Sequence, residues 1–291
     1  MKYKNVLSSI KATILTVALC PVASVMAFSD SPVIIDDAAL TKDLADEIGK
    51  YAAAKKTTPA KKLGEQLIEN KHASIQLPEA NPNALADIYG ERVGSVGIIA
   101  SVYKCTKCPL WHRSGCATCW VLTEDGVMVT NYHVFNGKDH DGFGVLMQDG
   151  KVAPVTEIIA ADKDHDIAIF RVEGNGYTPI PLGKAQHVGG NAHIIAHPDS
   201  RFFTYSAGDV TRYYKDRNRR KSYWMGVTAE YARGSSGGPV MDDAGNVIGM
   251  VASTNSIYYP PKNKKETKGP FQMVIRNCVP VDAIRKLIKQ P

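Results

Sequence analysis

Three stretches of the sequence carry the residue types of a nucleophilic catalytic site. The stretch ARGSSGGPV places Ser235 and Ser236 between glycines. A serine hydroxyl is a weak nucleophile at its ordinary pKa, so it needs a general base and a group that orients that base. VMVTNYHVF supplies His133 just after a predicted strand, and DKDHDIAIF supplies Asp166 at the start of a buried one. Taken singly, the serine stretch is typical of a tight turn, His133 of a structural histidine and Asp166 of a strand cap. Taken together, the three predict a Ser-His-Asp site.

The residues from Val93 onward have the composition of an all-β domain. Short runs such as GSVGIIASVY, DIAIFRV and NVIGMVAS are separated by Gly, Asp and Asn turns. Many short strands without intervening helices indicate an antiparallel sandwich or barrel. Before them, Leu40 and Leu44 recur at helical spacing, and Thr58-Pro59 predicts the start of a second helix. The segment VDAIRKLIKQ predicts a final amphipathic helix.

The motifs TNYHV, DHDIAIF and GSSGGPV, in this order, resemble those of the trypsin-like (chymotrypsin-fold) serine proteases, nearest to exported bacterial HtrA proteases. The resemblance covers roughly residues 85–290. It implies two six-stranded antiparallel β-barrels with the site between them. It also implies that His133 is the general base, Asp166 its orienting partner and Ser236 the nucleophile, because the pattern Gly-x-Ser-Gly-Gly-Pro begins at Gly234. The backbone N–H groups of Gly234 and Ser236 would form the oxyanion hole.

The expected organisation is an all-β, chymotrypsin-like domain with an N-terminal helical extension and a C-terminal helix. The predicted boundaries are a signal peptide at 1–27, a helical extension or pro-segment at 28–84, and a protease domain at 85–291, with barrels at about 93–182 and 183–279. Whether the extension is removed stays open. The 55 residues after the nucleophile leave no room for the PDZ domain of typical HtrA proteases.

The first residues have the pattern of a secretory signal. Lys2, Lys4 and Lys11 precede or flank an apolar run, and small residues end at Ala27. A retained anchor is the alternative, but Pro21 leaves the run short of the roughly 20 residues that a spanning helix needs. We therefore expect an exported, periplasmic or secreted protein without a stable membrane anchor. Removing three lysines and no acid lowers the formal charge from +6 to +3, which is too mild to imply nucleic acid, so polypeptides are the expected partners.

Two positions near the nucleophile bear on activation and specificity. Ser235 stands where vertebrate-type trypsins keep an aspartate that pairs with a newly cut N-terminus, so that switch is absent. Glu230 lies six residues before Ser236, where trypsins hold the acid of their primary specificity pocket. By resemblance this implies substrate binding through Lys or Arg, and an exposed glutamate outside the pocket is the alternative.

The stretch CTKCPLWHRSGCATC contains Cys105, Cys108, Cys116 and Cys119. In an exported protein such a cluster indicates either two disulfides or a metal site. In a hairpin centred on His112, Cys105 would face Cys119 and Cys108 would face Cys116, which predicts a two-rung disulfide ladder. The same symmetry fits four thiolates on one zinc ion, although the gap is shorter than in a usual zinc ribbon. A redox role within one C-x2-C pair is a third possibility.

The leading hypothesis is an exported serine endopeptidase, a hydrolase that cleaves peptide bonds through an acyl-enzyme and needs no cofactor. A catalytically idle protease fold acting as a binding module or chaperone is the alternative from another class. A metal- or thiol-based function on a barrel scaffold is the third. The intact set of His133, Asp166 and Ser236 favours the first hypothesis. The sequence leaves the oligomeric state open.

Overall fold

The computed structural model describes residues 33–69, 71–137, 139–215, 221–262 and 267–289. The predicted signal peptide lies outside these residues. The chain from Ile35 onward forms one compact unit.

Six antiparallel strands close into the first barrel in the order β2-β4-β5-β8-β7-β6, and pairing of β2 with β6 completes the ring. A short strand, β3, extends the sheet beyond the end of β4 by pairing with the last residues of β2. The bounds are β2 (Val96–Lys104), β3 (Trp111–Arg113), β4 (Ala117–Val121), β5 (Val127–Thr130), β6 (Gly142–Met147), β7 (Val152–Asp162) and β8 (Ile167–Val172).

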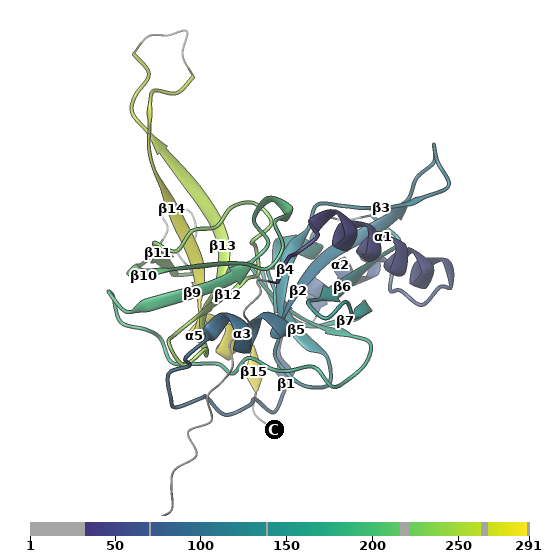
Figure 1. Ribbon diagram of the computed structural model, residues 1–291, viewed down its shortest axis with the longest axis horizontal. Coiled ribbons are helices and arrows are strands. Elements are labelled where there is room, and N and C mark those ends of the chain that lie inside the picture. The colour runs from purple at the N-terminus through teal and green to yellow at the C-terminus, as the bar shows by residue number, and fades with distance from the viewer. Residues whose placement is uncertain (1–32, 70, 138, 216–220, 263–266, 290–291) are drawn as a thin grey trace, which may run out of the picture. The chain divides into compact units, whose positions relative to one another are not determined.

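The second barrel is also closed, in the order β10-β11-β14-β13-β12-β9. Its strands are β9 (Asn191–Ala196), β10 (Thr204–Tyr214), β11 (Trp224–Val227), β12 (Pro239–Met241), β13 (Val247–Tyr258) and β14 (Phe271–Pro280). Figure 1 shows β13 and β14 continuing as a long ribbon beyond the other strands of this barrel. The expectation of two six-stranded antiparallel barrels in a chymotrypsin-like fold is therefore confirmed.

Side-chain alternation along β2 shows how the core is divided. Ile98 joins one buried cluster, which also holds residues of the second barrel such as Ile195 and Met250. Its neighbour Ile99 joins another cluster, built within the first barrel and around Phe135. Successive strand residues point to opposite faces, so one strand contributes both to the packing between barrels and to the packing of its own barrel.

The N-terminal helices pack on the first barrel. Helix α1 (Asp37–Ala53) begins at Asp36, whose Oδ1 accepts hydrogen bonds from the N–H groups of Ala38 and Ala39, so the carboxylate caps two otherwise unpaired donors. Leu44 and Ile48 of α1 enter the inter-barrel cluster. Helix α2 (Ala60–Glu69) buries Leu63 and Leu67 in the first-barrel cluster. The predicted helical extension thus shares its core with the barrel.

The final predicted helix is present but shorter than its pattern suggested. Helix α5 (Val281–Lys286) ends before Ile288–Lys289, which forms strand β15. This strand pairs in parallel with β1 (Ala73–Ser74). Backbone pairing with a distant segment therefore overrides the helical periodicity of the last residues. The remaining short helices are α3 (Ile88–Arg92), η1 (Val93–Ser95), α4 (Tyr132–Phe135) and η2 (Pro198–Ser200).

Candidate active site

His133 and Asp166 form a doubly bonded pair on the first barrel. His133 lies on α4, directly after β5, and its Nδ1 is 2.8 Å from Oδ2 of Asp166. The backbone N–H of His133 donates to Oδ1 of the same carboxylate at 3.0 Å. Asp166 has a φ of 60°, a left-handed conformation that Asp and Asn adopt more readily than most residues. The buried Asn131 fixes this backbone by donating to the carbonyl of Asp166 at 2.9 Å.

This pairing determines which nitrogen of His133 is basic. A proton on Nδ1 is held by the Asp166 carboxylate, which leaves Nε2 as the nitrogen with a free lone pair. The His133 side chain is 50% exposed, whereas that of Asp166 is 13% exposed. The imidazole can therefore meet a substrate while its partner stays shielded.

Ser236 lies in a turn between β11 and β12 that requires glycine on both sides. Gly234 has a φ of +98° and Gly237 a φ of +89°. A Cβ on Gly234 would lie 2.4 Å from the carbonyl oxygen of His197, and one on Gly237 would lie 2.1 Å from that of Thr118. Both the backbone conformation and the available space exclude a side chain here.

The two adjacent serines occupy different environments. Ser235 is fully buried, and its Oγ has no hydrogen-bond partner among the described residues. Ser236 is partly exposed and lines a cavity. Only the hydroxyl of Ser236 is therefore open to a substrate.

Thr118 of β4 connects the first barrel to the Ser236 turn of the second. Its backbone N–H donates to the carbonyl of Ser236 at 2.8 Å, and its Oγ1 donates to the carbonyl of Gly234 at 3.0 Å. Its own carbonyl accepts from Oγ1 of Thr130 at 2.7 Å. Sequence reasoning missed this residue. The only signal was a polar side chain within the apolar run ATCWV, which a buried strand tolerates when the hydroxyl has a partner.

The turn leaves two backbone donors free. The N–H groups of Ser235 and Gly238 donate to carbonyls of the turn itself, and that of Gly237 donates to the carbonyl of Val251 in β13. Those of Gly234 and Ser236 donate to no acceptor within the described part of the chain. Two unpaired N–H groups beside a hydroxyl are the donors that an oxyanion hole requires.

The hydroxyl of Ser236 is not hydrogen-bonded to His133 in the described structure. Its Oγ donates instead to the carbonyl of Ala252 at 3.4 Å. This contact is long for an O–H···O bond and is therefore weak. In proteins without bound substrate, hydrogen bonds between nucleophile and base are often long or unformed, so the arrangement fits a resting site.

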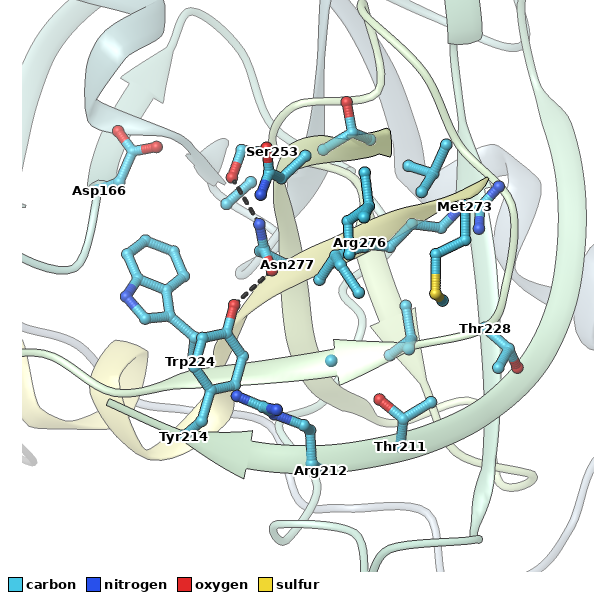
Figure 2. A pocket seen from close by; sticks show the side chains of 18 of the residues that line it. Asp166, Thr211, Arg212, Tyr214, Trp224, Thr228, Ser253, Met273, Arg276 and Asn277 are labelled. Atoms are coloured by element: carbon cyan, nitrogen blue, oxygen red, sulfur yellow. Dashed lines mark hydrogen bonds between the residues drawn. The ribbon is translucent and has the colours of Figure 1, made fainter. Parts of the chain in front are cut away.

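A cavity of about 1030 Å³ lies beside the His133–Asp166 pair. His133 and Asp166 form one part of its wall, and β10, β11, β13 and β14 form the rest. Figure 2 shows Asp166 at one end and Met273 and Thr228 at the other, with Asn277 between them donating to Ser253 Oγ at 3.3 Å. A smaller adjoining cavity is lined by Ser236.

The large and the small cavity share a wall. The residues that line both are Ala252, Ser253 and Thr254 of β13. The His133–Asp166 pair of one barrel and Ser236 of the other therefore open onto adjoining depressions.

Glu230 lies outside the wall of the large cavity. Its carboxylate is 83% exposed and pairs with Nη2 of Arg276 at 2.7 Å. Arg276 does line the cavity. The structure therefore places Glu230 as in the alternative, an exposed glutamate neutralised by an arginine, and gives no support for recognition of basic side chains through it.

A buried histidine lies directly against the Ser236 turn. His197 is fully buried, and its Nδ1 accepts a hydrogen bond from the N–H of Phe203 at 3.0 Å. Its ring packs edge-on against Phe202 and Phe203. Burial lowers the pKa of His197 to about 4, so the imidazole is neutral at pH 7. The carbonyl oxygen of His197 occupies the space beside Gly234, so His197 packs directly against the Ser236 turn.

The cysteine segment forms a different hairpin from the one predicted, and the prediction of a turn centred on His112 is wrong. Strands β2 and β3 pair with Tyr103 opposite His112. The turn is therefore centred on Lys107 and Cys108, about five residues earlier. The mirror spacing of the cysteines does not coincide with the register of the strands.

The four thiols are consequently not brought together. Cys119 lies in β4 opposite Gly97 and is fully buried, which raises its pKa. It does not face Cys105, so the two-rung ladder is not formed. Cys105, Cys108, Cys116 and Cys119 are all free thiols in the structure. Among the described residues, the four thiols do not form one group of possible metal ligands.

The double barrel defines a chymotrypsin-like fold, and the His133–Asp166 pair and the glycine-bounded Ser236 turn are its candidate site. Residues 117–250 match the family model described as a trypsin-like peptidase domain. This stretch of the chain is therefore similar to trypsin-like peptidase domains.

The chain is also similar to curated relatives and to a solved structure. The chain is 29% identical over 139 residues to the mitochondrial serine protease HTRA2 of Drosophila pseudoobscura pseudoobscura, covering 45% of this chain and 32% of the relative. It is 27% identical over 144 residues to the uncharacterized protein y4bJ of Sinorhizobium fredii (strain NBRC 101917 / NGR234), covering 48% and 22%. A solved HtrA-type protease with tripeptide superposes with a TM-score of 0.54 at 18% identity, covering 69% of this chain and 61% of that one.

The chain spans a third or less of the length of these curated relatives. Among the helices of the described residues, none is long and apolar enough to cross a bilayer.

Proposed function

We propose that this protein is a serine endopeptidase that cleaves polypeptides through an acyl-enzyme on Ser236. One observation carries the proposal. A histidine oriented by a carboxylate on the first barrel and a serine beside two free N–H groups on the second open onto adjoining cavities with a common wall. Base, nucleophile and oxyanion donors are the three parts that acyl transfer requires.

The chemistry follows from these positions. Ser236 Oγ leaves its weak contact with Ala252 and bonds to the carbonyl carbon of the substrate, while Nε2 of His133 takes its proton. The N–H groups of Gly234 and Ser236 stabilise the negative charge on the carbonyl oxygen. His133 then gives the proton to the departing amine, and water repeats the sequence to release the acyl group. Asp166 holds the ring and stabilises the imidazolium throughout.

We also propose that the enzyme is exported. The basis is the order of the first residues, in which lysines flank an apolar run that ends in small residues at Ala27. Mass spectrometry of the protein recovered from a producing bacterium tests this. Cleavage after Ala27 is expected, and an uncleaved cytoplasmic product contradicts export without affecting the assignment of the peptidase site.

Labelling with a fluorophosphonate, which reacts with an activated serine, tests the activity. We expect the full-length protein to be labelled and to cleave an unfolded protein substrate, and Ser236→Ala to lose both by several orders of magnitude. Ser235→Ala is the matched control. The Ser235 hydroxyl is buried and has no partner among the described residues, so its removal is expected to leave activity nearly unchanged.

Labelling of the Ser236→Ala protein would contradict the assignment of the nucleophile. A folded wild-type protein that neither labels nor cleaves would instead indicate an idle protease fold that binds polypeptides.

A further inference from the structure

The turn between β2 and β3 gathers three metal-binding side chains that the peptidase site does not use. The thiols of Cys105 and Cys108 and the imidazole of His112 place one ligand atom each within 4.8 Å of the others. Cys108 Sγ and His112 Nε2 are 3.0 Å apart. We call these three residues the hairpin cluster.

The register of the hairpin explains why these residues meet although the predicted set did not. Tyr103 of β2 is directly opposite His112 of β3, so their side chains share a face. Cys105 directly follows the last residue of β2, and Cys108 lies in the turn. Cys116 follows β3 and lies beyond the opposite end of this short strand. A C-x2-C-x3-H set is therefore formed by local backbone geometry.

The spacing of the ligand atoms suits a tetrahedral ion after a small contraction. With Zn–S near 2.3 Å and Zn–N near 2.0 Å, tetrahedral geometry sets ligand atoms about 3.6–3.8 Å apart. The hairpin cluster already has its atoms within 4.8 Å, and all three side chains are partly exposed. Small rotations of the two cysteine side chains would complete the contraction. Two thiolates and an imidazole are ligands that favour Zn²⁺ over the hard cations Mg²⁺ and Ca²⁺.

The paired residues of β2 and β3 next to the hairpin cluster, which we call the stem, pack against neighbouring side chains. The ring of Tyr103 stacks on that of His112, with centroids 5.8 Å apart and planes at 25°. Its ring also lies 5.0 Å from that of His140. On α1, Gly49 leaves room for Trp111, since a Cβ there would lie 2.3 Å from the indole. The orientation of His112 is therefore set by packing before any ion binds, as is common for metal ligands.

We propose that Cys105, Cys108 and His112 form a Zn²⁺ site that clamps the β2–β3 turn against the stem. Binding replaces the proton of each thiol, so two protons pass to solvent for each ion bound, and a water molecule takes the fourth position. The ion is structural, because a complete peptidase site lies elsewhere in the chain and uses no thiol.

The test uses the full chain carrying Ser236→Ala, purified without reductant, with Zn²⁺ and Co²⁺ as the probes. We expect one zinc per chain by elemental analysis, and thiolate-to-cobalt charge-transfer absorption after exchange. Cys108→Ser and His112→Phe are expected to weaken zinc binding at least about a hundredfold. The phenyl ring keeps the contact with Tyr103 and removes only the donor nitrogen.

Cys116→Ser is the matched control, because it removes a thiol from the same segment but from outside the hairpin cluster, and we expect unchanged zinc content. Removal of zinc by a chelator is expected to lower the melting temperature of the parent and not that of Cys108→Ser. Near-ultraviolet circular dichroism shows whether each variant is folded. Zinc retained by folded Cys108→Ser would overturn the proposal. So would a metal-free parent protein whose mass is lower by two hydrogens because Cys105 and Cys108 form a disulfide.

Discussion

The buried imidazole of His197, next to the Ser236 turn, allows a quantitative prediction of how the stability of the protein depends on pH. In the unfolded chain His197 titrates near its ordinary pKa of about 6.5, whereas in the folded protein burial lowers the pKa to about 4. Between these values the unfolded state binds one more proton than the folded state, so stability rises with pH. At 1.36 kcal/mol per pH unit, the neutral histidine contributes about 3 kcal/mol above pH 6.5, and this is lost as the pH falls to about 4.

Protonation has a second, local cost. The proton would enter at Nδ1, which now accepts the N–H of Phe203, so that hydrogen bond would be broken. The carbonyl oxygen of His197 lies close to Gly234. A shift of the His197 backbone would therefore move the Ser236 turn first. We expect acid to loosen this turn before it unfolds the barrels.

Urea unfolding between pH 4.5 and 8 measures the effect, in the Ser236→Ala background to prevent self-digestion. The comparison is with His197→Asn, whose Oδ1 can accept the Phe203 N–H but cannot titrate. The difference between the two unfolding free energies is expected to be flat above pH 7 and to change by up to about 1.4 kcal/mol per pH unit between pH 6.5 and 4.5. A difference that stays constant over the whole range would refute the assignment of a neutral buried His197.

Three further substitutions test the peptidase site and its support. Asp166→Asn suits the left-handed backbone but presents the wrong partner to His133, so kcat should fall about 10⁴-fold with the fold retained; near-normal turnover would contradict the orienting role. Thr118→Val removes a hydrogen bond worth about 1 kcal/mol and is expected to lower kcat/KM about fivefold, with recovery in Thr118→Ser, which keeps the hydroxyl. Gly237→Ala should lower the free energy of unfolding by more than about 2 kcal/mol. Gly150→Ala is the control, because Gly150 has a similar positive φ but open space around it, and its loss should be smaller. Equal losses of stability in urea would show that the clash at Gly237 is relieved.

The fold could be predicted because its signals are local. Short β-rich runs bounded by turn residues indicate antiparallel strands wherever they occur, and the glycines of GSSGGPV mark a turn that only glycine can adopt. The positions of His133 and Asp166 at strand ends follow from the same runs. These features depend on neighbours in the sequence, and the structure places them as expected.

The features that could not be predicted depend on strand register or on distant partners. The cysteine spacing suggested one hairpin axis, but backbone pairing of Tyr103 with His112 set another. Thr118 acts on a turn that is 116 residues away in the chain. The pairing of Glu230 with Arg276 spans 46 residues, so the sequence offered no means of finding the arginine that neutralises it.

The division of the site between two closed barrels also decides when the protein can act. Strand β14 closes the second barrel between β11 and β13, and its residues Met273, Arg276 and Asn277 form part of the cavity wall. A chain emerging from the ribosome therefore displays His133 and Ser236 before β14 has completed the large cavity beside His133. Because these pairings join distant segments, closure is slow relative to local folding. A newly made chain is thus expected to cleave no other protein until its last strands have paired.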